Sequence, residues 1–128
     1  MKGLWPAVIL STALFAADGE RVYRERCASC HRIMLAPGES GHRDTGMKAP
    51  TMRMVAMRLK HVIRIHSGDE DIHRAVIVGF IKHYLEKPAE DYAVCMEEMI
   101  ERYGVMPPQK GMTEEEKEAV ADWVYDRF

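Results

Sequence analysis

The chain has 128 residues, the size of a single domain, and carries 18 Lys and Arg against 20 Asp and Glu. This near balance of charge argues against nucleic acid as a partner, because proteins that bind a polyanion usually carry an excess of positive charge. Hydrophobic residues make up 47% and charged residues 30% of the chain. That composition is typical of a globular fold and excludes a disordered chain, a collagen-like fibre and a membrane bundle.

The N-terminus, residues 1–17, has the pattern of a secretory signal. Lys2 precedes an apolar run, Leu4–Phe15, which is followed by two alanines. The run is well short of the ~20 apolar residues that span a bilayer. We therefore expect an exported, periplasmic protein whose mature domain is 18–128 and has no transmembrane span. If the signal is not cleaved, the protein would instead be membrane-associated.

Apolar periodicity predicts four or five helices and no dominant strands, which is an all-α fold. The first helix begins near Asp18 and leads into Cys27 and Cys30. Residues 31–49 contain one proline, Pro37, and three glycines, Gly38, Gly41 and Gly46, which predicts a loop. A short second helix is expected over Met52–Leu59.

The second half of the chain contains two capping-box patterns. Ser67 with Glu70 predicts a helix that runs to Pro88, and Thr113 with Glu116 predicts the start of the last helix. Between them an apolar stripe predicts one further helix that ends at Gly104. Its members are Tyr92, Cys95, Met96, Met99 and Tyr103.

The chemistry is concentrated in Cys27-Ala28-Ser29-Cys30-His31. A C-x-x-C-H run in an exported chain is the attachment signature of c-type haem. Positions i and i+3 at the end of a helix lie on one face, so both cysteines can form thioethers to the two vinyl groups of the porphyrin. His31 would then lie beneath the ring with a nitrogen at the iron.

The same residues could instead form a zinc site, a redox pair or a structural disulfide. A zinc site would need a second Cys pair or a His pair at finger spacing, which the sequence lacks. A thioredoxin-like redox pair would need a βαβ pattern, and a structural disulfide would leave His31 unexplained. The motif and the predicted signal together favour one covalent haem, since the run occurs once.

A sixth iron ligand must come from elsewhere in the chain. Met106 is the leading candidate, because Pro107 and Pro108 directly after it restrict the backbone. A Met thioether stabilises ferrous iron and raises the potential. The alternative for any Met is simple packing, which we expect for Met52, Met54 and Met57 and for Met96 and Met99.

These motifs resemble the class I c-type cytochromes, which carry one haem with His and Met ligands. The resemblance covers residues 19–128 and implies a small cytochrome c fold, electron transfer as the activity, and His31 and Met106 as axial ligands. It also implies that Tyr23 packs near Trp123 or Val124, since the first and last helices of the family cross. A proline near the haem motif supplies a carbonyl to the proximal histidine, and Pro50 matches better than Pro37.

Several residues could compete with this assignment. Any of the other histidines could give a bis-histidine haem, although we expect them to be solvent-exposed. They are His42, His61, His66, His73 and His83. Cys95 is expected to be a buried small hydrophobe rather than a reactive thiol. Arg53 and Arg58 are candidates for neutralising the haem propionates.

The sequence thus predicts a soluble, monomeric carrier that passes one electron between redox donor and acceptor proteins and is not an enzyme. The alternatives are a haem enzyme of the peroxidase or nitrogen-oxide reductase type, or a sensor with a displaceable sixth ligand. Residues 18–66 carry 10 Lys and Arg against 5 Asp and Glu, whereas residues 67–128 carry 7 against 15. This asymmetry predicts a charge dipole if the fold keeps the two halves apart.

Overall fold

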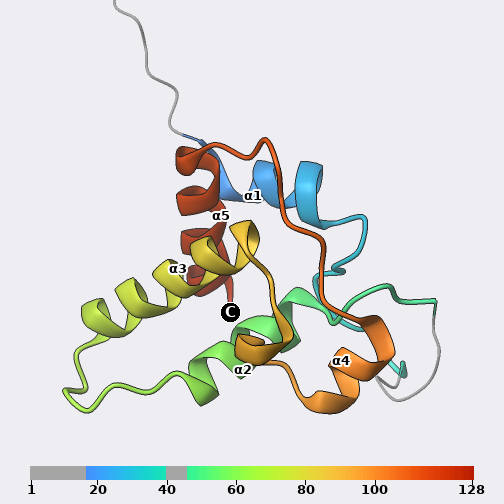
Figure 1. Ribbon diagram of the computed structural model, residues 1–128, viewed down its shortest axis with the longest axis horizontal. Coiled ribbons are helices and arrows are strands. Elements are labelled where there is room, and N and C mark those ends of the chain that lie inside the picture. The colour runs from blue at the N-terminus through green and yellow to red at the C-terminus, as the bar shows by residue number, and fades with distance from the viewer. Residues whose placement is uncertain (1–16, 40–45) are drawn as a thin grey trace, which may run out of the picture.

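The computed structural model describes residues 17–39 and 46–128. Within these ranges all of the regular secondary structure is helical (Figure 1). Residues 1–16 of the predicted signal, and His42, lie outside the described residues. The elements are α1 (Gly19–Val22) with a π-helical turn (Tyr23–Cys27), α2 (Met52–Val62), α3 (Glu70–Glu86), a 3₁₀ turn (Glu90–Tyr92), α4 (Glu97–Tyr103) and α5 (Glu114–Arg127). Five α-helices and the absence of strands in the described ranges confirm the all-α prediction. None of the described helices is both long and apolar enough to cross a bilayer.

The first helix begins where the sequence predicts. The Asp18 carboxylate caps it by accepting from the backbone N–H of Glu20 at 3.0 Å and of Arg21 at 3.4 Å. The helix then widens, and Ala28 N–H donates to Tyr23 O at 2.9 Å, a five-residue spacing. Single π turns of this kind often lie next to functional residues, and this one leads directly into Cys27.

α1 and α5 cross in close contact (Figure 1). The rings of Tyr23 and Trp123 stack with their centroids 4.8 Å apart, which confirms the expected proximity of these residues. Gly19 lies at the crossing, where an added Cβ would lie 2.5 Å from Trp123 Cβ and clash with the Ala119 carbonyl. A residue without a side chain is therefore required for the two helices to approach this closely.

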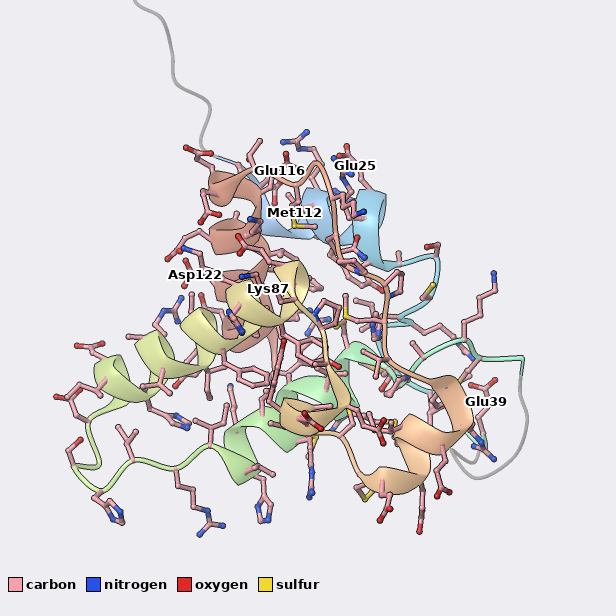
Figure 2. All side chains as sticks on the ribbon, viewed as in Figure 1. Glu25, Glu39, Lys87, Met112, Glu116 and Asp122 are labelled. Atoms are coloured by element: carbon pink, nitrogen blue, oxygen red, sulfur yellow. The ribbon has the colours of Figure 1, made fainter. Side chains whose placement is uncertain are left out.

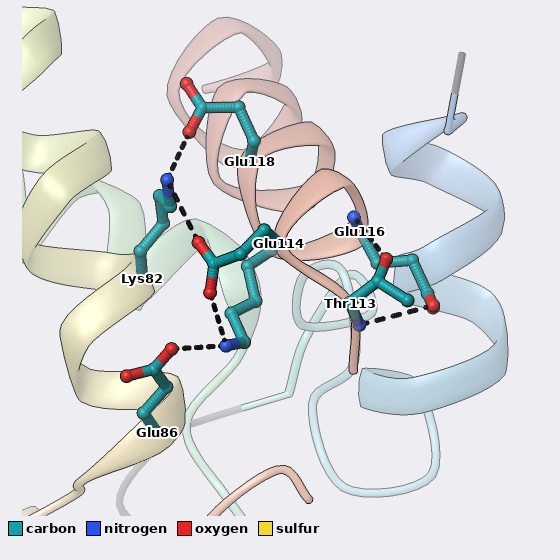
Figure 3. Close-up of polar contacts among 7 residues, drawn as sticks. Lys82, Glu86, Thr113, Glu114, Glu116 and Glu118 are labelled. Carbon is teal, nitrogen blue, oxygen red and sulfur yellow. Dashed lines mark hydrogen bonds and ion pairs between the residues drawn. The ribbon is translucent and has the colours of Figure 1, made fainter. Parts of the chain in front are cut away.

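α5 also packs against α3, and charged pairs flank that contact (Figure 3). Thr113 and Glu116 form the predicted capping box, which is confirmed by both of its hydrogen bonds. Lys117 pairs with Glu86 and with Glu114, and Lys82 pairs with Glu118 at 2.7 Å. These contacts fix the first turns of α5 against the C-terminal half of α3.

Two predicted elements differ from the structure. Asp69, not Ser67, caps α3, because its carboxylate accepts from Asp71 and Ile72 N–H while the Ser67 hydroxyl accepts from Asp69 N–H. The apolar stripe of residues 92–103 is not one helix. Tyr92 belongs to the 3₁₀ turn, and α4 begins only at Glu97 after the extended Met96.

The core contains one main cluster around the α1–α5 crossing and a smaller one between α2, α3 and α5. Val22, Ala56 and Val120 are buried in the first, as is Met112, just before α5 (Figure 2). Met57 and Met96 are exposed, so the expectation that they fill the core is wrong. Helical spacing alone did not show that these two side chains lie on the solvent side of their segments.

Candidate haem-binding site

The Cys27–His31 motif forms a closed turn at the end of the first helix. The N–H groups of Cys30 and His31 both donate to Cys27 O, at 3.1 and 2.8 Å. Cys27 is buried and Cys30 is exposed, and the two thiols are not joined to each other. Burial raises the pKa of the Cys27 thiol to about 11, with Arg26 acting in the opposite direction. The Cys27 thiol is thus uncharged at neutral pH, and both cysteines border the same cavity.

His31 is held by two hydrogen bonds on opposite sides of the residue. Its Nδ1 lies 2.7 Å from Pro50 O, and its own carbonyl accepts from the Tyr23 hydroxyl at 2.7 Å. Because a carbonyl oxygen can only accept, Nδ1 carries the proton and Nε2 keeps a free lone pair. Burial lowers the pKa of His31, only partly offset by the bond to Pro50. The neutral imidazole is the form that binds a metal.

The position of Pro50 follows from the pairing of its neighbours with the chain after the motif. Met52 N–H donates to Arg32 O at 2.7 Å, and Arg53 N–H donates to Ile33 O at 3.0 Å. The Thr51 hydroxyl, itself buried, caps α2 by accepting from Met54 N–H. These contacts fix the start of α2 against residues 32 and 33 and bring the Pro50 carbonyl to the histidine. The runner-up, Pro37, is exposed and does not line the cavity.

A cavity of about 230 Å³ opens beside the motif. Cys27, Cys30, His31 and Met106 all line it, and none of the described carboxylate side chains does. Its walls are apolar side chains of α2, α3, α4 and the following loop, including Val55, Leu59, Phe80, Ile81, Leu85 and Ile100. The two thiols of the motif, the neutral imidazole of His31 and a Met thioether beside a largely apolar wall are the donor set that a covalent haem requires.

Met106 lies in the loop that joins α4 to α5. The loop begins at Gly104, whose φ of 71° ends α4 in a conformation that favours glycine. After Pro107 and Pro108 it is anchored to the end of α3, because Gln109 N–H donates to Leu85 O at 2.8 Å. Met106 thus reaches the cavity from a pinned segment, but Met52 and Met99 line the cavity as well.

The other described histidines do not line the cavity. His61, His66 and His83 are exposed, as expected. His73 is half-buried, which corrects the expectation of a solvated side chain. Its Nε2 donates to Ile63 O at 2.7 Å and its Nδ1 lies 3.3 Å from the Tyr125 hydroxyl. Both ring nitrogens are engaged in tying the α2–α3 connection to α5.

Cys95 is half-buried and lines the cavity, so it is only partly the buried hydrophobe that was expected. Burial raises the pKa of its thiol, and nearby Arg58 opposes that rise. Cys95 reaches the cavity because the helix is interrupted before α4. The helical spacing of the apolar residues did not indicate this interruption.

The cations at the cavity are not the predicted ones. Arg53 and Arg58 do not line it, and Arg58 Nε instead donates to Val94 O at 2.9 Å. Arg26 and Lys48 line it. Arg26 could have been found in the sequence, since it directly precedes Cys27, whereas Lys48 is brought there by the turn before α2.

Residues 15–124 match the sequence model of the family described as "Cytochrome C oxidase, cbb3-type, subunit III". The chain belongs to this family of cytochrome c domains. An uncharacterized protein of Aquifex aeolicus (strain VF5) is 31% identical over 147 aligned positions, which cover 100% of this chain and 89% of that protein. No solved structure matches.

Membership of a cytochrome c family gives the cavity its cofactor, which is covalently bound haem c with its iron. The activity of such a domain is haem-based electron transfer, and domains of this type are typically electron carriers that work with redox partners. A domain of this type also suggests an exported protein. The residues around the cavity fit haem c, because sulfur and imidazole donors line a wall that is largely apolar.

Proposed function

We propose that the protein is a soluble one-electron shuttle with a single haem c, exported to the periplasm after removal of residues 1–17, and not an enzyme. Cys27 and Cys30 carry the thioether bonds, and His31 and Met106 are the axial ligands. The observation that carries this proposal is the convergence of these four side chains on one apolar cavity. A haem held there supplies a one-electron ferric–ferrous couple, and the chain supplies everything that tunes it.

The role of His31 rests on its hydrogen bond to Pro50. A ligating histidine that donates its second N–H to a carbonyl keeps one tautomer and one ring orientation. Here Nδ1 is bonded to Pro50 O at 2.7 Å, so Nε2 is the atom available for iron. The Tyr23 hydroxyl on the His31 carbonyl supports the same placement from the helix side.

The role of Met106 rests on the loop around it. Met52 lies in the first turn of α2 and Met99 in the middle of α4, so both are part of helices that pack the cavity wall. Met106 is instead carried by a loop between Gly104 and the anchored Gln109, with two prolines that limit its conformations. A fixed thioether would favour the ferrous state and a raised potential.

The apolar wall has two consequences for electron transfer. It keeps water from the iron, so few solvent dipoles must reorient when the charge on iron changes. It also leaves the propionates as the main charges of the bound group, and Arg26 and Lys48 are the cations that line the cavity for them. Within residues 17–39 and 46–128, no carboxylate lines the cavity to oppose that pairing.

Covalent attachment is tested on protein matured with haem-ligation machinery in an oxidising compartment. Haem should remain on the wild-type chain through acid-acetone extraction and denaturing electrophoresis, with the mass of one haem. Cys27→Ala and Cys30→Ala should each weaken retention, and the double variant should abolish it. Cys95→Ala is the matched control and should retain haem like the wild type. Free extraction of haem from the wild type would contradict the proposal.

A further inference from the structure

Four aromatic side chains of α3 and the following 3₁₀ turn are in contact one after another. Phe80 and Tyr84 stack with ring centroids 5.8 Å apart, and Tyr84 meets Tyr92 edge-on at 5.9 Å. Tyr92 then lies 5.5 Å from the imidazole of His83. We call Phe80, Tyr84, Tyr92 and His83 the aromatic series.

The aromatic series leads from the cavity to solvent. Phe80 and Tyr84 line the cavity that we assign to haem. Tyr92 is 36% exposed, and His83 is exposed. The series is also held in place at both ends. Phe80 and Tyr84 belong to the 17-residue helix α3, and the segment after Tyr92 is joined to α2 by the hydrogen bond from Arg58 Nε to Val94 O. An electron that moves along it crosses ring-to-ring gaps rather than one long gap through solvent.

The segment at the outer end of the aromatic series, residues 86–98, combines exposed apolar side chains with exposed carboxylates, and we call these carboxylates the acidic rim. Met96, 43% exposed, follows Tyr92 in the chain, and both are residue types that are enriched in protein interfaces. Residues 86–98 contain five carboxylates and a single ammonium, that of Lys87, which lies just beyond the end of α3 (Figure 2). Glu86 is paired with Lys117, and the remaining carboxylates are exposed. They are Glu90, Asp91, Glu97 and Glu98.

We propose that a one-electron redox protein with a basic surface docks over Tyr92 and Met96, and that the aromatic series is the route between it and the haem. This inference rests on the proposed electron-carrier function. In the forward direction one electron leaves ferrous iron, which becomes ferric, and reduces an oxidised centre in the partner. No bond to a ring forms or breaks, and no proton moves. The acidic rim attracts the basic partner, while Tyr92 supplies both the contact and the first ring of the route.

The first test uses the haem-loaded ferrous protein and two oxidants of opposite charge in stopped-flow mixing. Tris(phenanthroline)cobalt(III), an aromatic cation, stands in for the basic partner, and hexacyanoferrate(III) is the anionic control. Tyr92→Leu keeps an apolar side chain but removes the ring, and should slow the cobalt reaction by about fivefold, the size of one aromatic contact. The hexacyanoferrate rate should stay unchanged. Ile72→Ala, at an exposed apolar position in the first turn of α3, should alter neither rate.

The acidic rim is tested by Glu90→Gln with Asp91→Asn. The cobalt rate should fall about tenfold at low salt, by loss of steering, and this difference should vanish as salt is added. The control removes two carboxylates elsewhere, Glu20→Gln with Glu115→Gln, and should have little effect. Equal slowing with both oxidants, or equal slowing by the control pair, would overturn the proposal.

The site of docking is measured directly on the wild type, which needs no variant to fold. Hexaamminechromium(III), a paramagnetic and inert cation, should broaden the amide resonances of residues 90–92 and 96–98 first. Broadening confined to other parts of the surface would overturn the proposal. Spectra and reduction potentials are recorded for every variant beforehand. A chain without covalent haem would refute the proposed function, whereas a haem-loaded chain whose rates ignore Tyr92 would refute only this inference.

Discussion

His31 is positioned from two sides, by Pro50 through its ring and by Tyr23 through its carbonyl. The Tyr23 ring also stacks on Trp123, so one side chain links the α1–α5 crossing to the histidine. Burial raises the pKa of Tyr23, which keeps its hydroxyl protonated and able to donate. At the scale of single residues, the site therefore depends on the hydroxyl of Tyr23, a residue that does not line the cavity.

Tyr23→Phe isolates this hydroxyl, because the aromatic ring and its stacking on Trp123 remain. Loss of the bond leaves the His31 carbonyl without that donor and should lower the free energy of unfolding by about 1 kcal/mol. Chemical denaturation of the haem-loaded protein measures the change. Unaltered stability would mean that water replaces the hydroxyl without cost and that Tyr23 matters only through its ring.

At the scale of helices, Gly19 in α1 lies directly against the α5 backbone, at Ala119. Gly19→Ala should destabilise the fold by about 1–3 kcal/mol, the usual range for overpacking, because the helices must move apart. Gly79→Ala is the matched control. Gly79 is an exposed helical glycine of α3 with no atom within 4 Å of its would-be Cβ, so alanine should stabilise by about 0.5–1 kcal/mol. Thermal unfolding of both variants should shift in opposite directions, and a shift in the same direction would contradict the crossing geometry.

The far ends of α3 and α5 are joined by Arg74, which pairs with Asp122 at 3.1 Å and with Asp126 through two hydrogen bonds. Arg74 holds the pKa of Asp126 below its ordinary value. A carboxyl whose folded pKa is lowered stabilises the fold at neutral pH, and this contribution is lost as the pH falls through the folded value.

Arg74→Gln should therefore cost about 0.5–1 kcal/mol at neutral pH, a modest value because both side chains are partly solvated. The difference from the wild type should shrink as the pH is lowered through the depressed pKa of Asp126, and also as salt is added. Denaturant titrations across acidic pH measure it. A cost that stays constant with pH would show that Arg74 acts by packing on the Tyr125 ring, which it also faces.

At the scale of the whole molecule, the predictable features were those carried by neighbours in sequence. The Cys27–His31 turn and the Thr113–Glu116 capping box each need only a few consecutive residues. The contact between Tyr23 and Trp123 was expected only through the family resemblance, and other features that depend on distant contacts were missed. The need for glycine at position 19 comes from α5, a hundred residues away, and the half-burial of His73 comes from Tyr125.

The interruption of the helix before α4 shows why apolar periodicity alone can mislead. Tyr92, Cys95 and Met99 recur at helical spacing, yet Cys95 and Met99 reach the cavity from separate segments. These residues are apolar because they line one cavity. Residues on the buried face of one helix would be apolar too, so the spacing alone does not distinguish the two cases. The same cavity accounts for Lys48, which no local pattern distinguishes from a solvated lysine.

The basic first half and the acidic second half of the chain are not separated in space. The basic first half includes α1, which packs on the acidic α5, and Arg26 lies 4.0 Å from Glu116 across that contact. The acidic segment between α3 and α4 is a more local feature and does not depend on a global dipole. Partner docking is therefore expected to follow the surface at Tyr92 rather than the net charge.

The central claim is that His31 and Met106 hold the haem iron from opposite sides, and the near-infrared spectrum of the ferric protein tests it most directly. The wild type should show the weak band of an iron–thioether bond. Met106→Ala should lose the band and bind azide, whereas Met99→Leu, which removes another thioether from the cavity wall, should keep it. Persistence of the band in Met106→Ala, its loss in Met99→Leu, or a bis-histidine spectrum in the wild type would contradict the account.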